Sequence, residues 1–136
     1  MSLNVALLRS SFDLVIERQP QLTARFYQIL FARHPQVRPL FGRETTAQAH
    51  MLQQALVAVL EHVEDANWLT ETLGAMGRKH VDYGVTEEMY GWVTESLLAA
   101  IGEAAGDAFS PEVEGAWRDA LNAVSSLMIG GARAAA

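Results

Sequence analysis

The sequence predicts an all-α fold. Apolar residues recur every three or four positions along almost the whole chain, as they do on the buried face of an α-helix. Proline and glycine residues fall between these stretches, where helices commonly end. We found no convincing segment with the alternation of apolar and polar residues that is typical of a half-buried strand. We therefore expect one domain, residues 1–136, with about six longer helices and one short helix.

The first two helices are predicted on either side of Pro20. Their apolar faces consist of Leu8, Phe12 and Val15 in the first and of Leu22, Phe26 and Ile29 in the second. Pro35 and Pro39 then interrupt the helical pattern, which predicts a short turn that ends at Phe41.

The third helix is expected to begin after Thr45. Thr45 and Gln48 have the spacing of a capping box, in which two side chains bond to backbone amides of the first helical turn. A polar segment, residues 64–67, separates this helix from the fourth. The apolar face of the third helix consists of Leu52, Ala55, Val59 and Val63, and that of the fourth of Leu69, Leu73, Met76 and His80.

Glycine and cap residues delimit the last two helices. Gly84 can end the fourth helix in a left-handed conformation, and Thr86 can begin the fifth, which Gly106 ends. Ser110 is a suitable N-cap for the last helix, because Pro111 then occupies its first position. The inward faces are predicted to consist of Tyr90, Val93, Leu97 and Ile101, then of Trp117, Leu121, Val124 and Met128.

Composition excludes several kinds of protein. The net charge is -6 and the basic residues are scattered, so no basic face is expected that could bind nucleic acid or an anionic membrane. No apolar run approaches the length of a membrane span and no signal segment is seen, which favours a soluble, cytoplasmic protein without stable membrane insertion. The absence of cysteine excludes disulfides, thiol catalysis, zinc-thiolate sites and covalently attached haem.

Known catalytic motifs are missing as well. No glycine-rich sequence follows a predicted strand, so phosphate-binding and dinucleotide-binding loops are not expected. Neither an HExxH motif nor a pair of Glu-x-x-His motifs is present, which argues against a zinc hydrolase or a di-iron bundle.

Of the four histidines, only His80 lies on an apolar face. His34 adjoins a proline at a helix end, which predicts that it caps the last carbonyl groups. His50 and His62 lie off the apolar face of their helix and are predicted to be solvated. The pattern alone leaves His80 either as a buried structural histidine, the commoner case, or as a metal ligand.

Three further residues also have two interpretations. Gln48 either completes the capping box or points its amide into a pocket. Tyr27 follows Phe26 and is either a structural residue or a half-buried one with an inward hydroxyl. Phe41 would ordinarily fill the core.

Taken in order, these residues resemble the globin family, and more narrowly the globin domain of bacterial flavohaemoglobins and their single-domain relatives. The similarity extends over essentially the whole chain. Its most telling segments are FYQILFARHPQVRPLF at 26–41, the helix beginning at Gln48, GRKHVDYGV at 77–85 and EEMY at 87–90. The family's distal tyrosine, haem-packing phenylalanine and distal glutamine match Tyr27, Phe41 and Gln48, and its proximal histidine and tyrosine match His80 and Tyr90.

The resemblance implies a non-covalently bound haem b with His80 as the axial iron ligand. It also implies that Tyr27 and Gln48 stabilise bound oxygen on the opposite side. The other residues expected around the haem are Phe41, Leu52, Leu56, Tyr90 and Val93. Since a ligating imidazole usually donates its second N–H to a nearby acceptor, we expect a hydrogen bond from His80 to the carbonyl of Met76.

The resemblance further implies that oxygen and nitric oxide are the ligands, and that nitric oxide is converted to nitrate. No flavin or nicotinamide domain is seen in the sequence, so we expect a separate NAD(P)H-dependent reductase to supply electrons. The alternatives are oxygen storage or delivery and gas sensing through a partner. A helical protein that has lost haem is a third alternative. The joint presence of Tyr27, Phe41, Gln48 and His80 argues against it. We expect a monomer or a weak dimer.

The sequence departs from the family pattern at Ala132. Flavohaemoglobins usually place a glutamate fifteen residues beyond the tryptophan that matches Trp117, and the segment 130–133 contains no carboxylate. A carboxylate linked to the proximal histidine would favour oxygen–oxygen cleavage. We therefore expect weak peroxidase-like chemistry.

Overall fold

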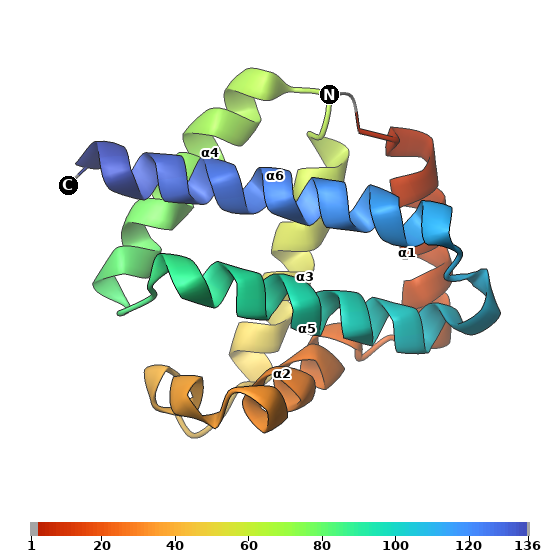
Figure 1. Cartoon of the computed structure of the whole chain (residues 1–136), viewed down its shortest axis with the longest axis horizontal. Coiled ribbons are helices and arrows are strands. Elements are labelled where there is room, and N and C mark those ends of the chain that lie inside the picture. The colour runs from red at the N-terminus through yellow and green to blue at the C-terminus, as the bar shows by residue number, and fades with distance from the viewer. Residues whose placement is uncertain (1–2, 136) are drawn as a thin grey trace.

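The computed structural model describes residues 3–135, which form six α-helices and two 3-10 helices without any strand (Figure 1). The elements are α1 (Val5–Arg18), α2 (Leu22–Arg33), η1 (Pro35–Leu40), α3 (Thr46–Glu61), α4 (Ala66–Asp82), α5 (Glu87–Ala105), η2 (Gly106–Ala108) and α6 (Pro111–Ala135). The predicted all-α fold is confirmed. Within the described chain, no helix has the length and apolar character needed to cross a membrane.

Local sequence signals fix most helix ends. The Ser110 hydroxyl accepts a hydrogen bond from the amide of Val113, which confirms the predicted N-cap of α6. Gly84 has a φ of 90°, and the amide of Val85 bonds to the carbonyl of His80, as expected of a left-handed helix end.

The predicted capping box of α3 is wrong. Thr45 is the N-cap residue, but its side chain makes no hydrogen bond to the first turn. Its φ and ψ of -109° and 6° differ from the extended conformation that lets a cap side chain reach the following amides. The side chain of Gln48 interacts instead with the hydroxyl of Tyr27.

The hydrophobic core lies among α1, α2, α5 and α6. Helix α5 packs on the other three, and α6 runs back alongside it in the opposite direction (Figure 1). The large apolar side chains that are almost completely buried are Leu8, Val15, Leu22, Phe26, Leu73 and Ile101.

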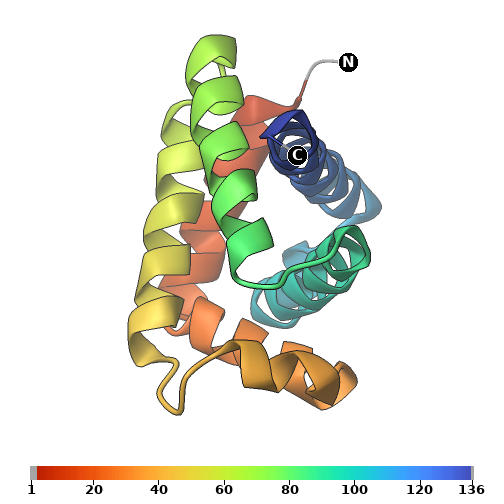
Figure 2. The ribbon, with the colours of Figure 1, turned by 90° about the vertical axis from the view of Figure 1, so that its left-hand side faces the viewer.

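By contrast, α3 and α4 bury few residues. On α3 only Ala49 and Leu60 are buried, and on α4 only Leu73, Gly74 and Gly77. Helix α3 packs on α2 and α1, whereas α4 packs mainly on α6. Figure 2 shows α3 at one side of the molecule and α5 and α6 at the other.

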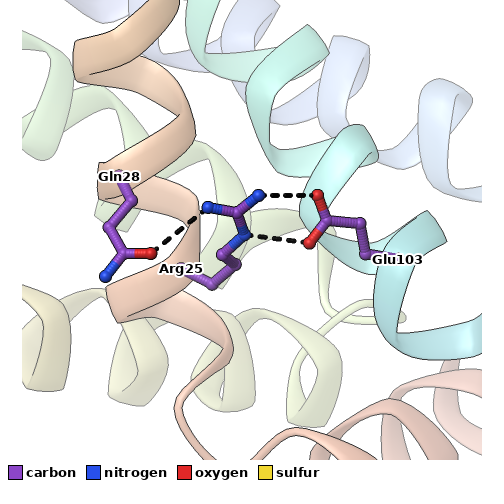
Figure 3. Close-up of polar contacts among 3 residues, drawn as sticks. All are labelled: Arg25, Gln28 and Glu103. Carbon is purple, nitrogen blue, oxygen red and sulfur yellow. Dashed lines mark hydrogen bonds and ion pairs between the residues drawn. The ribbon is translucent and has the colours of Figure 1, made fainter.

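Charged side chains tie α5 to its neighbours. Three of its glutamates, eight residues apart, each bind an arginine of another helix; the pairs are Arg25–Glu103, Arg118–Glu95 and Arg133–Glu87. Figure 3 shows the pair between α2 and α5, in which Arg25 donates two 2.9 Å hydrogen bonds to Glu103 and one to Gln28. These pairs are exposed, so we expect them to orient the helices more than to stabilise them.

Each of the three tryptophans has a polar partner on a different helix or at a helix end. Trp117 on α6 donates to the hydroxyl of Ser11 on α1 at 2.8 Å. Two histidine–tryptophan pairs are nearly parallel stacks: His34 on Trp92, with ring centroids 4.5 Å apart, and His62 on Trp68, at 4.0 Å.

These stacks overturn two predictions. His34 does not cap carbonyl groups, because its ring lies flat against Trp92 of α5. His62 is half-buried and not fully solvated, because it stacks on Trp68 and bonds to the carbonyl of Ala58. His50 is exposed, as predicted.

Candidate functional site

His80 lies near the end of α4, half-buried, and its orientation is fixed by a backbone group. Its Nδ1 lies 2.6 Å from the carbonyl oxygen of Met76, which confirms the predicted hydrogen bond. A carbonyl oxygen can only accept, so Nδ1 carries a proton, and in the neutral imidazole the lone pair is then on Nε2. Neutral imidazole in this form is a suitable ligand for a metal ion or haem iron.

Two tyrosines flank His80. The ring of Tyr90, on α5, lies 6.4 Å from the imidazole, and that of Tyr83 lies 5.8 Å away but is largely exposed. Burial raises the pKa of Tyr90, and the negative charge of Glu87 raises it further. Tyr90 is therefore a neutral phenol beside the imidazole.

In this chain Ala132 stands where the flavohaemoglobin pattern has a glutamate. Ala132 is half-buried on α6, and the next residue, Arg133, binds Glu87 at the start of α5. The hydrogen bonds from Arg133 hold the pKa of Glu87 below its usual range. Near Tyr90 there is thus a carboxylate that the sequence analysis missed, and an arginine neutralises it. Its position one helical turn before Tyr90 was the only available signal.

A second cluster surrounds Tyr27, which is only 6% exposed. Its ring contacts those of Phe26, Phe31 and Phe41, at centroid distances of 4.8, 5.8 and 5.4 Å. Burial raises the pKa of Tyr27 to about 12, although the interaction with the Gln48 side chain opposes this. The phenol is therefore neutral and able to donate a hydrogen bond.

Gln48 comes to this cluster from the first turn of α3. The residue is exposed, but its side chain reaches the hydroxyl of Tyr27 on α2. Thr23, which the sequence analysis missed, joins the same two helices through a 2.7 Å hydrogen bond from its hydroxyl to the carbonyl of Ala49. A threonine on the apolar face of α2 was the available signal.

Arg38 holds the loop between Phe41 and α3. It donates to the carbonyls of Gly42 and Arg43, at 2.7 and 3.0 Å, and its guanidinium lies over the ring of Phe31. The role of this residue could not be predicted from the sequence, because its partners are backbone groups that no side-chain pattern indicates.

The remaining predicted residues differ in burial. Leu52 and Leu56, on α3, are half-buried and pack against the core. Val93 is 37% exposed, so the prediction that it packs inward is wrong: Thr94 and Leu97 occupy the core-facing side of α5 there. Its proximity to a haem stays a prediction.

An open hollow of about 470 Å³ lies on α4, on the helical turns that precede His80. It is lined by Glu71, Thr72, Ala75, Met76 and Lys79. Met76 thus belongs to two features: it lines the hollow, and its carbonyl orients His80.

These residues fit a haem. The structure provides an imidazole with a free Nε2, a buried phenol, and apolar side chains on α3 and α5 that are only partly covered. Met51 and Val57 on α3 and Val93 on α5 are 59%, 39% and 37% exposed, and a planar apolar group would remove such surface from water. The structure gathers Tyr27, Phe41 and Gln48 in one cluster and His80 and Tyr90 in another, with Leu52 and Leu56 on α3.

Comparison with known proteins identifies relatives of the whole chain. The flavohaemoprotein of Bordetella pertussis is 33% identical over 132 residues, which cover 95% of this chain and 33% of that protein. The chain therefore spans about a third of the length of this relative. An uncharacterised globin-like protein of Aquifex aeolicus is 29% identical over 125 residues, covering 92% of this chain and 88% of that one.

A solved structure has the same architecture. It is an engineered carbene transferase, described as a candidate nitric oxide dioxygenase of Rhodothermus marinus. The TM-score is 0.84 at 26% identity, and the match covers 96% of this chain and 92% of that one. The sequence profile of the globin family matches residues 24–128, a range that includes both clusters described above. The chain belongs to the globin family, has the globin fold and is related to the globin domains of flavohaemoglobins.

Proposed function

We propose that this globin holds haem b through His80 and binds oxygen and nitric oxide on the opposite side, beside Tyr27 and Gln48. The single observation that carries this proposal is the 2.6 Å contact between Nδ1 of His80 and the carbonyl of Met76. It fixes the tautomer and the direction of the ring. His62 makes the same kind of contact with the carbonyl of Ala58, but its ring is stacked on Trp68, whereas the ring of His80 lies beside Tyr90 of α5.

When bound, haem would supply an iron that takes diatomic ligands and the redox chemistry for converting nitric oxide to nitrate. His80 would hold that iron with a neutral imidazole. Tyr90, beside it, is a neutral phenol, and the nearby carboxylate of Glu87 is paired with Arg133. The proximal side therefore donates little extra electron density, which favours holding oxygen over splitting peroxide.

On the other side, Tyr27 and Gln48 would donate hydrogen bonds to a bound ligand that carries partial negative charge. Each such bond is worth roughly 1–3 kcal/mol where water is excluded. Tyr27 is buried among aromatic rings whereas Gln48 is exposed, so we expect Tyr27 to contribute more. Phe41, Leu52 and Leu56 would keep water from the ligand.

The haem assignment is tested by absorbance of the reconstituted protein. We expect a Soret band in the wild type that is lost or shifted in His80→Ala. His50→Ala is the matched control, because His50 is exposed on α3 and should leave the spectrum unchanged. In Tyr27→Phe, which keeps the ring and removes only the hydroxyl, oxygen dissociation should accelerate by roughly 5- to 150-fold, the equivalent of the hydrogen bond. Unchanged dissociation would remove Tyr27 from the site.

The nitric oxide reaction needs a separate measurement. The oxygenated protein, mixed with nitric oxide and recycled by an added NAD(P)H-dependent reductase, should give many equivalents of nitrate per haem. A yield that stops at one equivalent would contradict the enzymatic proposal and favour oxygen storage or delivery.

A further inference from the structure

Helices α4 and α6 touch through their backbones at two glycines. A Cβ atom placed on Gly77 of α4 would lie 1.9 Å from the carbonyl oxygen of Met128. A Cβ atom placed on Gly131 of α6 would lie 2.3 Å from the Cα of Gly74. The obstructing atoms belong to the main chain in both cases, so rotation of a side chain cannot relieve either overlap. We call this contact the glycine seam.

Neighbouring glycines of the same helices are not restricted in this way. A Cβ on Gly74 would meet its nearest heavy atoms at 3.7 Å, an ordinary contact, and one on Gly130 would have nothing within 4 Å. The requirement for glycine therefore falls on positions 77 and 131, although all four residues lie within helices.

The glycine seam is the main support of the helix that carries His80. Of the residues of α4, only Leu73, Gly74 and Gly77 are buried, and α6 is the principal neighbour of this helix. Gly77 directly follows Met76, whose carbonyl orients His80, and lies three residues before the imidazole. A displacement of α4 at Gly77 would therefore move the histidine and its hydrogen-bond partner together.

We infer that Gly77 and Gly131 are positioning residues for His80: the absence of their side chains lets α4 lie directly on α6, which sets the place of the imidazole in the site. The inference rests on the proposed role of His80. With alanine at position 77, the carbonyl oxygen of Met128 would have to recede from 1.9 Å to at least 3.4 Å, about 1.5 Å, before contact became ordinary. Since α4 has less buried surface than α6, α4 is the helix that gives way.

Four single variants test the inference: Gly77→Ala and Gly131→Ala in the seam, with Gly74→Ala and Gly130→Ala as matched controls one turn or one residue away. Each is reconstituted with haem, and the iron–histidine stretching frequency of the ferrous protein is measured by resonance Raman spectroscopy. We expect this frequency to shift in both seam variants and to stay at the wild-type value in both controls. The controls should also unfold at the wild-type temperature or above it, because alanine favours helix more than glycine does.

The possible outcomes separate the two proposals. If the wild type takes up no haem, the proposed function fails and the inference with it. If haem binds through His80 but the seam variants keep the wild-type frequency, the inference alone is overturned. Failure of both seam variants to fold, with both controls folded, would also overturn it, because the glycines would then serve stability and not the position of His80.

Discussion

The hydroxyl of Tyr27 is protected from ionisation by its burial, and this has a consequence for stability at alkaline pH. In the folded chain its pKa is raised to about 12, against an ordinary value of 10 in the unfolded chain. Between these two values the unfolded chain loses the phenolic proton while the folded chain keeps it. The stabilising contribution is thus complete below pH 10 and is lost as pH rises through 12.

We therefore expect Tyr27→Phe to flatten the alkaline loss of stability. Relative to this variant, the wild type should lose about 2–3 kcal/mol of unfolding free energy between pH 10 and 12, since one pKa unit corresponds to about 1.4 kcal/mol. Urea unfolding curves at a series of pH values measure the difference, and they cancel the contribution of Tyr90, whose pKa is also raised. Parallel curves for the two proteins would contradict the burial argument.

Two buried serines should respond oppositely to removal of the hydroxyl. Ser96 is completely buried and its hydroxyl has no hydrogen-bond partner among residues 3–135, whereas Ser11 accepts from Trp117 and donates to the carbonyl of Leu7. Ser96→Ala should therefore leave stability unchanged or increase it, because nothing compensates the desolvation of this hydroxyl. Ser11→Ala should cost roughly 1–3 kcal/mol, because it leaves the indole N–H of Trp117 unpaired.

Thermal unfolding of the two serine variants checks this contrast directly. Equal destabilisation by both substitutions would mean that Ser96 has a polar partner in solution.

At the same scale, several residues whose partners lie close in the chain were predictable, although the equally local capping box of Thr45 and Gln48 was wrong. The bond between His80 and Met76, the left-handed Gly84 and the Ser110 cap all depend on groups at most five residues away. Predictions failed for His34 and His62, because each ring stacks on a tryptophan. Trp92 is brought to His34 by helix packing, and Trp68 is brought to His62 by the turn between α3 and α4. A hydrophobic pattern cannot distinguish a solvated imidazole from one stacked on an indole.

Among the elements, the helix boundaries followed from proline, glycine and polar breaks, because these residues act on the backbone locally. Which helices pack against each other could not be predicted from these residues. The glutamates at 87, 95 and 103 have the sequence pattern of a solvated face, yet each binds an arginine of another helix. A spacing of eight residues rotates by about 80° around a helix, so the three glutamates lie on different sides of α5, and the spacing does not indicate which neighbour supplies each cation.

The contact between the glycines of α4 and α6, which supports the candidate site, could not be predicted from the sequence either. In the sequence they only weaken the prediction of a helix, since glycine is a poor helix former. Their role depends on the folded chain, in which the main chains of α4 and α6 are in direct contact. His80 could thus be proposed as the proximal histidine from the sequence, by resemblance, whereas the glycine contact that supports its helix could not be predicted.

For the whole molecule, the uneven distribution of the core predicts how the chain behaves without haem. Helices α1, α2, α5 and α6 share the hydrophobic core, while α3 buries only Ala49 and Leu60. We expect amide hydrogen exchange of the apoprotein to be slow in the four core helices, faster in α4 and fastest in α3. Exchange in α3 and α4 should slow on haem addition, because a ligand that binds only the folded form opposes local opening.

Exchange measured by mass spectrometry on peptides from each helix, with and without haem, checks this order. Uniform protection of all six helices in the apoprotein would show that α3 and α4 are held by contacts other than the buried residues named above.

The positions of the three tryptophans also allow folding to be followed by their intrinsic fluorescence. Trp117 joins α6 to α1, Trp92 joins α5 to the end of α2, and Trp68 lies at the corner between α3 and α4. Each indole is in contact with a different polar group, one a hydroxyl and two imidazoles. Variants that retain a single tryptophan would therefore distinguish, by intrinsic fluorescence, the folding of the core from the closing of the corner between α3 and α4.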